Sequence, residues 1–219
     1  MLWSADGHLL ARLLPLALGA AVSPMLLVFQ LLTLSSPRRG LSRSLAFLAG
    51  CTLVVLLWLG CAGWIASLLP RPGPGPDPIA AAFDALFALL LLSAGGWLLL
   101  QPPRPPQRSD TPGLLGPWLT GLTAMGCNLT SLVLFLPAIQ DISRSGLRGL
   151  AWWVVALFTA VLTLLPAWLP PALVLLAGQR GRRTLEALAG WVMPRQRGIN
   201  ACVVFGLALL LLSRAIWRL

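Results

Sequence analysis

The chain has 219 residues, of which 58% are hydrophobic and 10% charged, and sixteen basic residues against six acidic ones give a net charge of +10. This apolar fraction excludes a water-soluble domain and indicates an integral membrane protein. The basic residues are all arginines that lie between apolar stretches, where they set orientation and meet lipid headgroups, so we expect no nucleic-acid partner.

Charged residues divide the chain into six apolar windows, and a helix needs about 20 residues to cross the hydrocarbon. We predict an all-α fold with six transmembrane helices, near residues 9–34, 44–69, 81–100, 114–139, 150–177 and 198–217. The last window is short, so we expect Arg214 and Arg218 to snorkel outward and extend it. Asp84 is the only acid within these helices. We expect it to cap the interfacial start of the third, and a role in proton transport stays open.

The first predicted helix contains a proline at membrane depth. Pro24 follows Ser23 inside an uncharged stretch. A proline there removes one backbone hydrogen bond, so protein or a wet cavity must satisfy the carbonyl that it frees. Gln30 lies about two turns after Ser23 and shares its helix face. We predict that Ser23, Pro24 and Gln30 line a substrate site.

The fourth predicted helix carries a second break, at Gly126-Cys127-Asn128, about half a chain length after the first. Three helices per half is an odd number, so the second half must enter the membrane upside down. We predict two inverted three-helix repeats, 1–103 and 104–219, joined by a proline-rich linker at 101–113, with the binding site between them. Asn128, Thr130 and Ser131 are its predicted second-half residues.

The fifth predicted helix contains Pro166, Pro170 and Pro171, which we expect to kink or unwind it. Whether these prolines form a gate hinge or a static bend is left undecided. After it, apolar residues recur with helical spacing among arginines, which predicts a short amphipathic helix on the membrane surface. Its apolar residues are Leu185, Leu188, Ala189 and Val192.

Arginine placement predicts the orientation. Ten of the sixteen arginines fall in the loops after the first, third and fifth helices. Cytoplasmic loops carry the excess of basic residues. We therefore predict a multi-pass protein of the inner (plasma) membrane, with both termini extracytoplasmic.

The motif Gly19-Ala20-Ala21-Val22-Ser23-Pro24, followed by a basic turn, resembles the first-helix signature of the lysine exporter superfamily. The proline-broken segment 165–171, the amphipathic segment 185–191 and the glycine-containing last helix are similar to its peptidoglycolipid-addressing (GAP) branch, also called sulfolipid-addressing proteins. Asn128 stands where the superfamily often has Asn-Pro, but Leu129 replaces that proline here. The resemblance implies six helices and export of a lipid-linked or small amphiphilic solute. A homodimer is left open.

Other functions within this superfamily also stay open. A divalent-cation exchanger needs several oxygen ligands, and Asp84 alone supplies few. A thiol–disulfide electron carrier needs two facing thiols, but Met25 replaces the cysteine that follows Ser-Pro in those relatives, leaving Cys127. The fold could also serve a non-transporting assembly factor. We expect no enzyme, cofactor or metal site, because the sequence shows no nucleophile beside a base and no Cys/His cluster.

Overall fold

The computed structural model describes residues 13–36, 39–68, 78–100 and 113–217. Within these ranges the chain is helical with short connections and no strand, which confirms the predicted all-α class. A helix Leu13–Ala21 is followed by α2 (Pro24–Leu34), α3 (Gly40–Leu68), α4 (Pro78–Leu100), α5 (Leu115–Gly126), α6 (Leu129–Arg144), α7 (Leu150–Thr163) and α8 (Leu165–Trp217). Several predicted segments lie outside these ranges: the proline-rich residues 69–77, residues 101–112 of the predicted linker, Arg218 and the start of the first predicted helix.

Two of the described helices are long and apolar enough to cross a membrane by themselves, namely Gly40–Cys61 and Gly198–Trp217. Three further pairs are bent at a short break: Leu13–Ala21 with α2 by 45°, α5 with Thr130–Ser143 by 66°, and α7 with Leu165–Val192 by 75°. Counting each pair as one span gives up to five spans in the described residues. The predicted six spans require that α4 also crosses the membrane, although its apolar part, Ala81–Trp97, is shorter.

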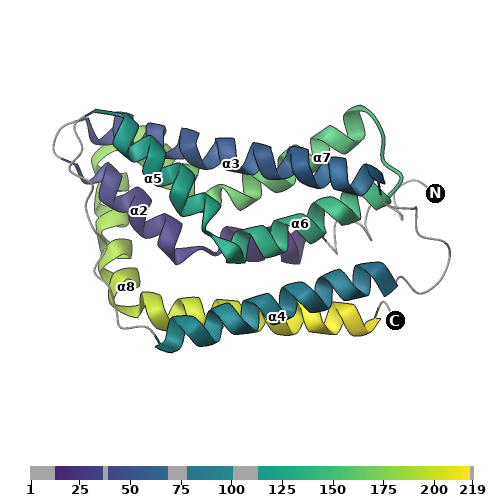
Figure 1. Cartoon of the computed structure of the whole chain (residues 1–219). Coiled ribbons are helices and arrows are strands. Elements are labelled where there is room, and N and C mark those ends of the chain that lie inside the picture. Colours follow the sequence, from purple (N-terminus) through teal and green to yellow (C-terminus); the bar gives the residue numbers. More distant parts are fainter. Residues whose placement is uncertain (1–12, 37–38, 69–77, 101–112, 218–219) are drawn as a thin grey trace.

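The helices follow a common long direction in Figure 1. The connection from α2 to α3 and the bend of α8 lie at one end, whereas the connection from α6 to α7 and the C-terminus lie at the other. Along one side of the molecule, α4 runs beside the final part of α8. Away from that side, α3 packs against α5. This arrangement places both breaks of the predicted repeat midway between the two ends.

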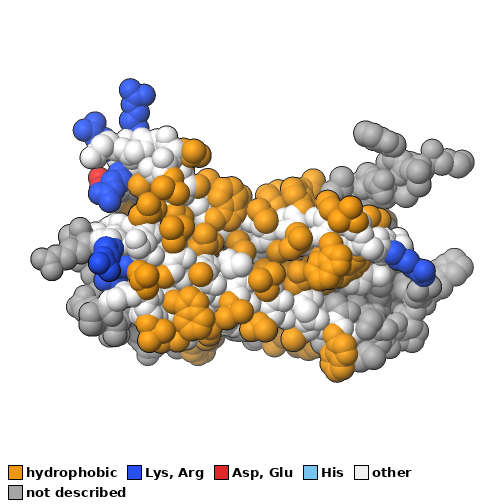
Figure 2. Space-filling view, turned by 90° about the horizontal axis from the view of Figure 1, so that it is seen from above, with side chains coloured by type: hydrophobic (Ala, Val, Ile, Leu, Met, Phe, Trp, Pro, Cys, Tyr) orange, Lys and Arg blue, Asp and Glu red, His pale blue; other side chains and the backbone are white. Residues whose placement is uncertain are grey.

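The surface carries apolar side chains across its middle. Figure 2 shows them over the central part of one face, with arginines at the ends. Among the exposed apolar side chains of the described residues are Leu89 at 65%, Leu176 at 87% and Leu209 at 66%. Soluble monomers do not expose contiguous apolar surface on this scale, so the surface is that of a membrane protein.

The long helix α8 is composite. Gly178 has φ 54° and ψ −125°, a conformation open to glycine, and it separates the segment after α7 from an arginine-rich segment. In that segment Leu185 and Val192 are buried, and Leu185 packs against Leu31 and Leu34 of α2. Arg180, Arg182, Arg183 and Glu186 are exposed. The predicted segment is helical, with Leu185 and Val192 buried and Leu188 38% exposed, and its placement on the membrane surface stays a prediction.

Close backbone contact holds α5 against α3. A Cβ atom added to Gly50 of α3 would overlap the Trp118 carbonyl oxygen, and one added to Gly121 of α5 would overlap the Phe47 carbonyl oxygen. The Cys51 thiol lies 3.4 Å from the Gly121 carbonyl oxygen at the same crossing. Small residues allow such an approach in membrane proteins. The crossing fixes α5, and with it the break that follows α5.

Candidate functional site

The two sequence breaks both become helix N-caps. Ser23 precedes α2, and its Oγ accepts a hydrogen bond of 3.4 Å from the Leu26 amide. Asn128 precedes α6, and its Oδ1 accepts one of 3.4 Å from the Ser131 amide. These residue types are favoured N-caps because their side chains satisfy amides that have no partner inside the helix. Each half of the chain thus starts a new helix at its break.

The two caps contact each other. Asn128 Nδ2 donates to Ser23 Oγ at 2.9 Å and to Ser131 Oγ at 2.8 Å. The first of these bonds joins residues 105 positions apart. In Figure 1 the start of α2 and the start of α6 lie together midway along the molecule. We call this group, consisting of Ser23, Asn128 and Ser131, the junction.

Ser131 also satisfies the carbonyl that Pro24 leaves free. Pro24 has no N–H, so the Ala20 carbonyl four residues earlier loses its helical donor. Ser131 Oγ donates to that Ala20 oxygen at 2.7 Å. A side chain of the second half therefore stabilises the broken backbone of the first, as membrane-depth breaks require.

The junction is neutral and lies just beneath the surface. The exposed fractions are 7% for Ser23, 8% for Asn128 and 0% for Ser131, whereas neighbouring Val22 and Met25 are 45% and 39% exposed. Two helix N-termini, those of α2 and α6, meet here, and each carries a partial positive charge. The arrangement can hydrogen-bond a polar group and favours a negative one.

Gln30 and Thr130, two other predicted site residues, lie outside this group. Gln30 is fully buried, and its Nε2 donates to the Ala167 carbonyl at 2.5 Å and to the Ser44 carbonyl at 3.3 Å. Ala167 is four residues before Pro171, so Gln30 satisfies another proline-freed carbonyl. Thr130 is half-buried beside the Asn128 cap.

The fifth predicted helix is bent, and the bend lies beside Pro166 rather than at Pro170 and Pro171. The chain turns by 75° between α7 and α8, around Leu164, and the helix continues through Pro170 and Pro171. Pro166 falls in the first turn of α8, where a proline costs no intrahelical bond. Trp168 Nε1 donates to the Val161 carbonyl at 2.9 Å across the bend. The kink therefore lies directly before Pro166, where a proline ends the preceding helix, while Pro170 and Pro171 leave the helix continuous.

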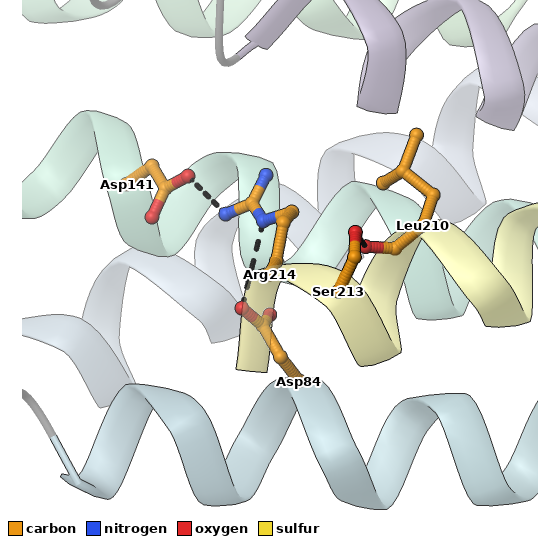
Figure 3. Close-up of polar contacts among 5 residues, drawn as sticks. All are labelled: Asp84, Asp141, Leu210, Ser213 and Arg214. Atoms are coloured by element: carbon orange, nitrogen blue, oxygen red, sulfur yellow. Dashed lines mark hydrogen bonds and ion pairs between the residues drawn. The ribbon is translucent and has the colours of Figure 1, made fainter. Parts of the chain in front are cut away.

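Three charged residues form a cluster that the sequence analysis did not find. Arg214 on α8 lies 2.6 Å from Asp141 Oδ2 on α6 and 3.5 Å from Asp84 Oδ2 on α4 (Figure 3). The side-chain exposed fractions are 17% for Arg214, 10% for Asp141 and 0% for Asp84. We call these three residues the charged cluster.

The charged cluster corrects three predictions. Asp84 is buried against a partner rather than capping an interface, Arg214 points inward rather than snorkelling outward, and α6 extends beyond residue 139 to include Asp141. The fourth predicted helix ended at residue 139, before Asp141, whereas the ranges 81–100 and 198–217 already contained Asp84 and Arg214. The sequence does carry a signal for this cluster: three apolar helices have residues of opposite charge within their first or last two turns.

The cysteines and acidic residues bear on the thiol–disulfide carrier and the cation exchanger that the sequence left open. Cys51 is buried, while Cys61, Cys127 and Cys202 are exposed, and all four are free thiols. Among the described residues, no three His, Cys, Asp or Glu side chains lie close enough together to hold a metal ion.

Comparison with known proteins gives a family match over nearly the whole described chain. The model of the family described as "Sap, sulfolipid-1-addressing protein" matches residues 13–217. No curated protein and no solved structure matches the chain. The matched range includes the junction and the charged cluster.

Proposed function

The chain belongs to the sulfolipid-1-addressing protein (Sap) family, and from that premise we propose that it exports a lipid-linked or small amphiphilic solute across the membrane. The headgroup binds at the junction, and the two halves of the chain move against each other to expose it to either side. The family description names a sulfolipid, and a sulfated headgroup carries the negative charge that two helix N-termini favour.

For this function we propose a fold of six membrane spans arranged as two inverted repeats, 1–103 and 104–219. The bent pair that ends in α2 corresponds to the bent pair of α5 and α6, and each has its break residue as the N-cap of its second helix. The third member of each half, α4 and the final part of α8, run beside each other (Figure 1). The proposed orientation puts the arginine-rich end in the cytoplasm and both termini outside.

The observation that carries the proposal is the 2.9 Å hydrogen bond from Asn128 Nδ2 to Ser23 Oγ. It joins the broken helices of the two halves, so an oxygen of a bound headgroup that accepts from Asn128 competes directly with the contact between the halves. Binding is thereby linked to their separation, which alternating access requires. In this proposal Pro24 keeps the break open, Thr130 borders the site, and Gln30 braces the segment that carries Pro170 and Pro171.

Reconstitution into liposomes tests the assignment. The probe is a fluorescent sulfatide, with fluorescent phosphatidylcholine as the uncharged-headgroup comparison, and a membrane-impermeant quencher reports movement between leaflets. We expect Ser23→Leu and Asn128→Leu to reduce sulfatide movement at least tenfold, because leucine removes the polar group and fills the site.

Thr123→Leu is the matched control, since Thr123 is exposed on α5 and bonds only carbonyls of its own helix at 2.9 Å and 3.2 Å. Normal sulfatide movement by both junction variants, with protein present in the liposomes, would refute the site. Absence of movement by the unmodified protein would refute export of this lipid class.

A further inference from the structure

The charged cluster lies at the opposite end of α6 from the junction. Asn128 caps the start of α6, and Asp141 lies one turn before its end at Arg144. A rise of 1.5 Å per residue separates the two by roughly 20 Å. One helix therefore carries both a residue of the junction and a residue of the charged cluster, so a change of partners at Asp141 acts on the helix that holds Asn128.

The cluster ties both halves of the chain together through charge. Arg214 of α8 contacts Asp141 of α6 and also Asp84 of α4, which belongs to the first half (Figure 3). Ionisable residues in membrane-spanning helices are expensive to bury, and they commonly mark substrate or ion pathways and proton relays. The contacts here cross between three helices, so they can hold those helices in one arrangement.

We propose that the charged cluster is a proton-binding site whose occupancy releases α6, and that this proton is the coupling ion for the export proposed above, on which the inference rests. Asp84 and Asp141 repel each other and share the Arg214 guanidinium. A proton taken from water onto an Asp141 oxygen removes that repulsion and the attraction to Arg214 together. Arg214 keeps its own proton and stays with Asp84, so α6 separates from α4 and α8.

Within the described ranges the neighbouring helices supply few other charges, and the helix Leu13–Ala21, which packs against α6 and α8, carries none. On α3, which packs against α6 and α8, the charged residue is Arg43, at the opposite end of the molecule. The sequence of α7 contains none, and Arg148, in the connection from α6 to α7, is exposed. Arg144 follows Asp141 by one turn on α6. Asp141 and Arg214, at 10% and 17% exposure, are the members of the cluster with exposed side-chain surface.

A proton fits this site better than a sodium ion. A hard cation needs several oxygen ligands around it, whereas a proton needs a single carboxylate oxygen. A guanidinium 2.6 Å from Asp141 Oδ2 would also repel a metal cation placed between the carboxylates. The two ions therefore give distinct outcomes in one assay.

The test follows sulfatide movement in the liposomes described above under imposed gradients. We expect a proton gradient at equal sodium to shift the steady-state leaflet distribution of sulfatide at least threefold, and an equal sodium gradient at constant pH to shift it by less than a quarter of that. Because this arm uses the unmodified protein, it does not depend on a variant that folds. A response to sodium alone would overturn the proton assignment.

Asp141→Asn neutralises the carboxylate that takes the proton and so imitates the proton-loaded cluster. Asp84→Asn removes the competing carboxylate and leaves the pair of Asp141 and Arg214 in place. We expect both variants to lose the response to the proton gradient, and we expect Asp141→Asn to move sulfatide at equal pH. Glu186→Gln removes an exposed carboxylate at the other end of the molecule and should keep that response. A gradient response retained by both Asn variants would overturn the inference.

Two outcomes separate the inference from the proposed function. Sulfatide movement that ignores the proton gradient in the unmodified protein would refute the coupling proton and leave export intact. If no sulfatide moves at all, export fails, and proton uptake by the purified protein after an acid pulse decides the inference by itself. The unmodified protein should then take up about one proton more than either Asn variant, and equal uptake would refute the site.

Discussion

The junction and the charged cluster both connect the first half of the chain to the second, but their contacts differ in strength. The junction uses neutral hydrogen bonds, and such bonds between membrane helices average about 0.6 kcal/mol because the separated helices also find partners. The charged cluster buries ions, and removing one partner of a buried ion pair costs about 3–5 kcal/mol. The comparison indicates that the junction can open and close at small cost, while the cluster holds until its charge changes.

The largest expected effect is at Arg214. We expect Arg214→Leu to lower the free energy of unfolding by about 3–5 kcal/mol, because Asp84 and Asp141 lose the guanidinium that they share. Thermal unfolding of the protein in detergent measures it. Arg148→Leu is the control, since Arg148 is exposed. Equal melting temperatures for the two variants would contradict the difference drawn between cluster and junction.

A smaller effect is expected where α3 and α5 touch beside the junction. Gly121→Ala places a methyl group against the Phe47 carbonyl, so the two helices must move apart. Overpacking of this kind costs about 1–3 kcal/mol. Gly60→Ala on α3 is the matched control, because a Cβ there meets nothing within 4 Å. If the two alanine variants unfold at the same temperature, this crossing does not support the junction.

Within the junction, Ser131 should matter more for stability than its neighbour Thr130. Ser131→Ala leaves the Ala20 carbonyl, already deprived of a helical donor by Pro24, without its 2.7 Å bond. An unsatisfied buried carbonyl costs about 1–3 kcal/mol. Thr130→Ala, at a half-buried position, should cost clearly less, as measured by thermal unfolding. The reverse order would show that the break at Pro24 is satisfied in another way.

The smallest expected effect is the direct coupling between the two caps. A double-mutant cycle of Ser23→Ala and Asn128→Ala should give an interaction energy of about 0.6 kcal/mol, and no more than about 1.7. The cycle is measured by unfolding in mixed micelles. An interaction energy of about 3–5 kcal/mol, as for the buried ion pairs, would make the junction a rigid contact. The difference in strength between the junction and the charged cluster, on which switching depends, would then be absent. A coupling of zero would mean that the 2.9 Å bond does not join the halves.

The amino-acid sequence determined the local features of this protein by itself. The apolar fraction indicated a membrane protein, Ser23-Pro24 and Asn128 indicated where helices break, and the spacing of Leu185 and Val192 indicated a surface helix. These features follow from chemistry within a few residues: proline has no N–H, serine and asparagine cap helices, and apolar residues repeat with the helical period. Such rules operate before any long-range contact forms.

Tertiary structure decided which of these features meet. The pairing of Asn128 with Ser23, the donation from Ser131 to the Ala20 carbonyl and the inward turn of Arg214 all join residues far apart in the chain. No local rule selects such partners, because an arginine near a helix end can reach either water or a buried carboxylate. Helix packing makes that choice, since it brings α4, α6 and α8 together and sets what each side chain finds within reach.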